Sequence, residues 1–101
     1  MKKYRIGRDA GPGPLVPAFD IRREDDGRIL IDGEQDTHGP TDAERTAILR
    51  VMEQPVRAFV GTGDDGHGGR VDAIGTIEPG TLEHFDNAVR RLPLPFYVMP
   101  R

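Results

Sequence analysis

Residues 56–77 read VRAFVGTGDDGHGGRVDAIGTI, and this stretch decides the fold. Two runs rich in β-branched and apolar residues, 56–60 and 71–77, flank a loop of mostly glycine at 61–69. Each run has the length and composition of a strand, and the loop contains nothing that belongs in a core. The stretch therefore predicts a β-hairpin near the centre of the chain.

The region before this hairpin predicts three more strands. Residues 2–7 alternate weakly between polar and apolar side chains, and Phe19 and Ile21 alternate with Asp20 and Arg22. Residues 25–27 (Asp-Asp-Gly) have the composition of a tight turn, and an apolar run at 28–32 follows them. Alternation and turn residues of this kind are typical of antiparallel strands joined by a short connection.

Two helical patterns flank the central hairpin. The first begins at Thr41, which forms a capping box with Glu44, and it ends before Pro55. The second follows Thr81, and we expect His84 to lie beside its apolar stripe. Apolar residues recur every three or four positions in both, as on one face of a helix: Ala47, Ile48, Val51 and Met52 in the first, and Leu82, Phe85, Val89 and Leu92 in the second.

The order of these elements predicts one α+β domain over residues 1–101. With a final strand after the second helix, the order is βββαββαβ. We expect a mainly antiparallel sheet of about five to six strands with two helices on one face. Hydrophobic residues make up only 36 % of the chain, so the core should be small and the loops long.

Composition excludes several classes of function. The chain has no cysteine and no serine, which removes thiol and serine nucleophiles and thiolate metal sites. A net charge of −3 makes nucleic-acid binding unlikely, because such proteins usually carry a basic patch. No apolar run is long enough to cross a bilayer, and no secretory signal is apparent, so we expect a cytoplasmic protein.

The central loop is the first candidate site. Residues 61–66 satisfy G-x-G-x-x-G, but a strand rather than a helix is predicted to follow, so the dinucleotide-binding interpretation fails. Carboxylates and imidazoles are nevertheless ligands for divalent metals. The candidate ligand residues are Asp64, Asp65 and His67 in this loop, with Asp36 and His38 in an earlier one.

The C-terminal segment is the second candidate site. Leu94, Phe96, Tyr97, Val98 and Met99 form an apolar stretch interrupted only by Pro95. Such a segment can add a strand to the sheet of its own chain or to that of another chain. We therefore consider these residues a candidate protein interface.

These observations favour a small, non-catalytic protein-interaction module of accessory, regulatory or inhibitor type. The partner would be another protein or a second copy of the chain, with no membrane involved. No cofactor is expected. The alternative is a protein that binds a small ligand or a divalent metal through the loop at residues 61–69.

Overall fold

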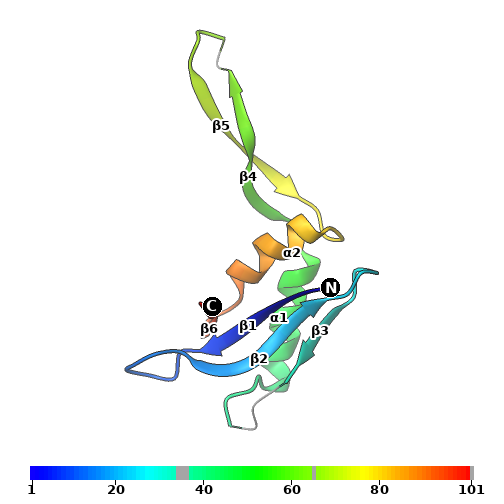
Figure 1. Cartoon of the computed structure of the whole chain (residues 1–101), viewed down its shortest axis with the longest axis vertical. Coiled ribbons are helices and arrows are strands. Elements are labelled where there is room, and N and C mark those ends of the chain that lie inside the picture. The colour runs from blue at the N-terminus through cyan, green and yellow to red at the C-terminus, as the bar shows by residue number, and fades with distance from the viewer. Residues whose placement is uncertain (34–36, 65, 101) are drawn as a thin grey trace.

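The computed structural model describes residues 1–33, 37–64 and 66–100, and in these it has the predicted α+β order. Figure 1 shows the elements along the chain. The strands are β1 (Lys2–Arg8), β2 (Val16–Arg23), β3 (Ile29–Asp32), β4 (Val56–Asp64), β5 (Arg70–Ile77) and β6 (Phe96–Val98). The helices are α1 (Asp42–Glu53) and α2 (Leu82–Ala88), and α2 continues into a 3-10 turn, η1 (Val89–Arg91).

The strands divide between two antiparallel sheets. One sheet has the order β3-β2-β1-β6, and the other consists of β4 and β5 alone. The α+β class, the antiparallel pairing and the element order are thus confirmed, while the central hairpin forms a sheet of its own. We call β4, β5 and the loop between them, residues 56–77, the arm, and the rest of the chain the body.

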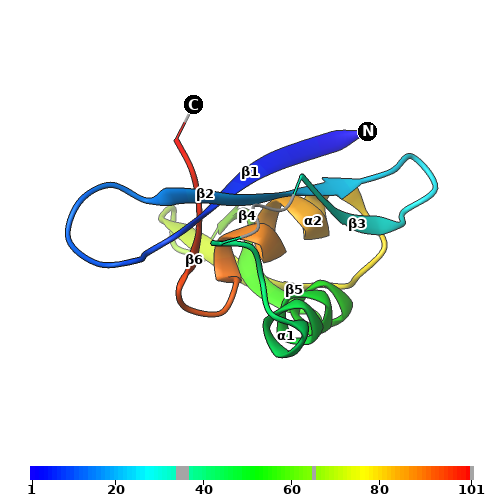
Figure 2. The same cartoon turned by 90° about the horizontal axis from the view of Figure 1, so that it is seen from below.

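The two helices cover the same face of the four-stranded sheet, as Figure 2 shows. The core lies between these two layers. The largest fully buried side chains come from the sheet, from both helices and from η1: Ile6, Ile21, Ile48, Phe85, Val89 and Phe96. Their burial follows from the apolar stripes read in the sequence, since a helix stripe and a sheet face are stable only against each other.

Side-chain caps fix the starts of both helices. The Thr41 hydroxyl accepts a hydrogen bond from the Glu44 amide at 3.1 Å, and the Glu44 carboxylate accepts one from the Thr41 amide at 3.0 Å. The Thr81 hydroxyl accepts a bond from the His84 amide at 3.1 Å. The predicted capping box is therefore confirmed, and it satisfies amides that have no partner within the helix.

Strand β4 is longer than the sequence indicates. It continues through residues 61–64, which we expected in the loop because glycine is poor in strands. In the structure these residues pair in register with β5, so the ladder with the partner strand holds them extended. In the described part of the chain, no helix is long and apolar enough to cross a membrane.

Candidate interaction surface

The arm projects from the body and gives the molecule an elongated shape (Figure 1). The structure measures 56 × 35 × 24 Å and has a Cα radius of gyration of 16.1 Å. A compact domain of this length has a radius of gyration of about 13 Å. The difference reflects the projecting two-stranded ribbon, along whose outer part no third strand or helix lies within residues 1–33, 37–64 and 66–100.

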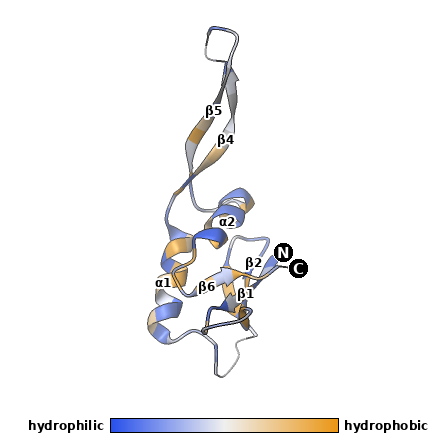
Figure 3. Ribbon diagram, turned by 90° about the vertical axis from the view of Figure 1, so that its left-hand side faces the viewer, coloured by the Kyte–Doolittle hydropathy of each residue, from blue (hydrophilic) through white to orange (hydrophobic). Residues whose placement is uncertain are grey.

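The arm is anchored to the body only at its base. Val56, Ala58 and Ile77 are buried and belong to the hydrophobic core. Val56 pairs with Ile77, and Ala58 pairs with Gly75, so these residues share the face of the ribbon that turns toward the helices. Apart from Phe59 and Ile74, the described residues farther out are mostly glycine or polar. Figure 3 shows the tip of the arm in pale to blue colours. The outer arm therefore has little apolar surface with which to fold back onto the body.

The opposite face of the arm carries an exposed apolar pair. Phe59 and Ile74 are cross-strand partners, and they lie on the same face as Arg57 because side chains alternate along a strand. Phe59 is 55 % exposed and Ile74 is 56 % exposed. Complete burial of either side chain is worth about 1.5–3 kcal/mol. This pair leaves much of that stabilisation unrealised in the isolated chain.

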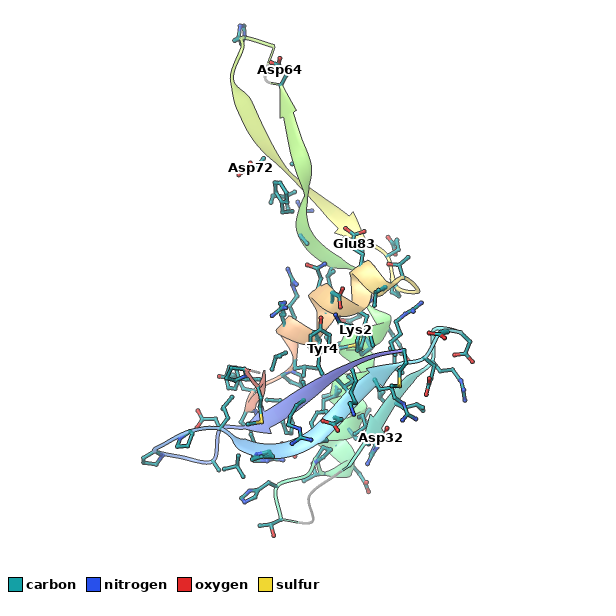
Figure 4. The ribbon with its side chains drawn as sticks, viewed as in Figure 1. Lys2, Tyr4, Asp32, Asp64, Asp72 and Glu83 are labelled. Carbon is teal, nitrogen blue, oxygen red and sulfur yellow. The ribbon has the colours of Figure 1, made fainter. Side chains whose placement is uncertain are left out.

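Charged residues lie on the same face, with opposite signs toward its two ends. Arg57 is on the base side of the apolar pair. Asp72 lies on the same face of β5 as Ile74, two residue pairs closer to the tip, and Asp64 ends β4 near the tip (Figure 4). Arg57, Asp64 and Asp72 are all exposed. Among the side chains that the structure describes, the face thus has a cation at the base, an apolar centre and carboxylates toward the tip.

Arg91 of η1 fastens the base of the arm to α2. Its Nη2 donates a hydrogen bond to the Arg57 carbonyl at 2.6 Å, and its Nη1 donates one to the Asn87 carbonyl at 2.7 Å. The Arg57 carbonyl therefore points out of the ribbon, along the outer edge of β4. The Arg91 side chain therefore already occupies the edge of β4 at Arg57.

The structure separates the two groups of sequence-predicted ligand residues. Asp64 and His67 lie at the tip of the arm, whereas His38 belongs to the loop before α1. Figure 1 shows this loop at the other end of the longest axis. Asp36 and Asp65 lie outside the described residues. The Asp64 carboxylate accepts a hydrogen bond from the Gly66 amide at 2.8 Å, as in an Asx-turn. Among the described residues, no group of three histidine, aspartate or glutamate side chains could hold a metal ion.

The predicted C-terminal interface residues have mixed environments. Phe96 is buried, and its ring meets Phe19 edge-on with 5.4 Å between centroids. Leu94 and Tyr97 are exposed, and β6 forms an edge of the four-stranded sheet. Val98 and Met99 line an open concavity of about 700 Å³ beside β1, with Lys3, Tyr4, Arg5, Asp20, Arg90 and Pro100.

An ion pair that the sequence did not reveal joins β1 to α1. Arg8 Nη1 and Nη2 donate to the two carboxylate oxygens of Glu44 at 3.0 and 2.7 Å, and the same guanidinium donates to the carbonyls of His38 and Gly39. Its carbon lies 4.6 Å from the centroid of the Phe96 ring. Hydrogen bonds from Arg8, supported by the Thr41 amide, lower the pKa of Glu44 to about 2. The sequence identified Glu44 only as a capping residue, and this role does not indicate that Arg8, 36 residues away, is its partner.

Among the residues that the structure describes, His84 is the polar residue buried in the core. Its Nε2 lies 2.6 Å from the carbonyl oxygen of Gln54, at the end of α1. Because a carbonyl oxygen only accepts, Nε2 must carry the proton. His84 therefore connects α2 to the chain that enters the arm, and its ring is not available as a surface base.

Comparison with known proteins gives no relative from which to transfer a function. No protein-family model, curated protein or solved structure matches this chain.

Proposed function

We propose that this chain is a protein-interaction module and that the arm is its contact element. The observation that carries the proposal is the Phe59–Ile74 pair, two large apolar side chains more than half exposed on a projecting ribbon. Aromatic and aliphatic anchors of this kind contribute much of the binding energy where proteins meet. The pair lies on the face of the ribbon opposite Val56, Ala58 and Ile77, so the core of its own chain does not cover it.

The stability of the ribbon supports the same proposal. An isolated two-stranded hairpin is marginally stable in water, and a third strand or a packed face is needed for independent stability. Beyond Ala58 and Gly75, the described arm has neither from its own chain. A partner on the Phe59 face would supply the missing layer.

The test is affinity capture with the purified protein as bait in extract from its native host, followed by quantitative mass spectrometry. The double variant Phe59→Ser/Ile74→Ser should lose at least nine-tenths of a specific partner's signal, because it removes the apolar centre of the arm. The matched control is Leu94→Ser/Tyr97→Ser, which removes two exposed apolar residues of the body.

The control also separates the two surfaces. Loss of the partner in the arm variant alone supports the arm as the contact element. Loss in the C-terminal variant alone would place the interaction on the segment at 94–99 and overturn the proposal for the arm. Circular dichroism of both variants checks that the body remains folded.

A further inference from the structure

We propose that the partner of the arm is the arm of a second copy of this chain. The two arms would pack antiparallel, with the Phe59–Ile74 faces together and a two-fold axis through this pair. This inference rests on the proposed function and names its partner.

The charge pattern of the arm is complementary to itself when one copy is reversed. In the antiparallel arrangement, the base of one arm lies over the outer half of the other. Arg57 of one copy then lies over the Thr62–Asp72 pair of the second copy, two residue pairs beyond the apolar centre, where its long side chain can reach Asp72. The two-fold axis repeats this contact at the other end, so two ion pairs flank one apolar cluster.

This pattern favours a second copy over a partner of one charge sign. An acidic surface would suit Arg57 but repel Asp72 and Asp64, and a basic surface would do the reverse. In a two-fold interface the same patch serves both subunits, and each contact between two different residues occurs twice. A patch with opposite charges on either side of an apolar centre meets that requirement.

The face is a better contact surface than the outer edge of β4. At the base of that edge, Arg91 already donates to the Arg57 carbonyl, so an added strand could not pair there without displacing it. The exposed apolar side chains lie on the face. Packing of the two faces covers them without breaking a hydrogen bond.

The area of the arm indicates the strength of the dimer. The paired part of the ribbon is roughly 27 Å long, at 3.4 Å per residue pair, and about 10 Å wide. Such a face is smaller than the ≈ 800 Å² per partner of a standard interface. Interfaces of this small size are weak and transient, so we expect a weak dimer, and the measurement must extend to high protein concentration.

The experiment is sedimentation equilibrium of the full chain from about 1 to 500 µM, with dissociation constants fitted for each variant. We expect Phe59→Ser, Arg57→Asp and Asp72→Arg each to raise the dissociation constant at least tenfold. Arg50→Asp, which makes the same charge change at an exposed position on α1, should leave it unchanged.

Mixing two of these variants gives a test that a folding defect cannot imitate. Arg57→Asp makes positions 57 and 72 both negative, and Asp72→Arg makes the same two positions both positive. Each alone should be monomeric, but an equimolar mixture should form a heterodimer in native mass spectrometry. Its formation supports the proposed contact.

A wild-type monomer at 500 µM would overturn this inference, and so would a dimer that the arm variants leave intact. The proposed function fails by a different result. If the chain stays monomeric but captures a partner through Phe59 and Ile74, only the second-copy inference is wrong. If it neither dimerises nor captures a partner through the arm, both are wrong.

Discussion

A partly buried ion pair between Arg8 and Glu44 joins β1 to the start of α1. The side chains of both residues are mostly shielded from solvent, and the bidentate geometry makes their hydrogen bonds strong. Glu44 also completes the capping box with Thr41. One carboxylate thus supports a helix terminus and a contact between the two layers of the body.

This contact predicts how stability depends on pH. The folded-state pKa of Glu44, about 2, lies below its ordinary value of 4.5, so its contribution is complete above about pH 5 and is lost as the pH falls toward 2. Glu44→Gln should lower the free energy of unfolding at pH 7 by about 2 kcal/mol and flatten the acid limb of the stability curve. Urea titrations from pH 2 to 7 measure both effects. Glu53→Gln, at an exposed position of the same helix, is the control, and an equal response from it would contradict the prediction.

His84 gives a second prediction for a single residue. His84→Ala removes the donor to the Gln54 carbonyl and leaves a cavity in the core, so we expect a loss of about 2–4 kcal/mol. Chemical denaturation at pH 7 measures the loss. His84→Phe keeps the volume and should recover part of it. A variant as stable as the wild type would show that the hydrogen bond and its burial contribute little.

Among the elements, the arm should be dispensable for folding of the body. Only its base, at Val56, Ala58 and Ile77, contributes to the core. Replacement of residues 59–74 by Asn-Gly joins Ala58 to Gly75 through a two-residue turn that suits a hairpin. The truncated chain should keep its helical circular dichroism and cooperative unfolding, and its radius of gyration by X-ray scattering should fall toward about 13 Å. Loss of cooperative unfolding would show that the outer arm stabilises the body.

The sequence predicted the elements well because their signals are local. The capping box at Thr41, the stripes of α1 and α2 and the hairpin at 56–77 all depend on residues close together in the chain. It did not predict that the hairpin leaves the main sheet, or that Arg8 reaches Glu44, because these depend on packing between distant segments. The candidate site was read from glycine, aspartate and histidine at the arm tip, while Phe59 and Ile74 looked like ordinary strand residues until their exposure was known.

For the whole molecule, we expect two levels of local stability. Amides of the four-stranded sheet lie over a buried core, whereas those of the outer arm belong to a ribbon exposed on both faces. Hydrogen exchange by mass spectrometry should therefore show slow exchange in peptides from β1 and β2 and fast exchange in peptides from residues 59–74. Because the proposed dimer would cover the arm, this fast exchange should slow as protein concentration rises from 1 to 500 µM. Concentration-independent exchange would argue against the dimer.

The fastening of Arg91 to the base of the arm has a consequence for the kinetics of assembly. Through one guanidinium, Arg91 joins the Arg57 carbonyl of the arm to the Asn87 carbonyl of α2, and this link adds to the core contacts that hold the base of the arm. An arm whose orientation is already fixed loses less conformational entropy on binding than an arm that moves about its base. In the proposed dimer, this fixed orientation would allow a larger fraction of encounters between two molecules to lead to binding.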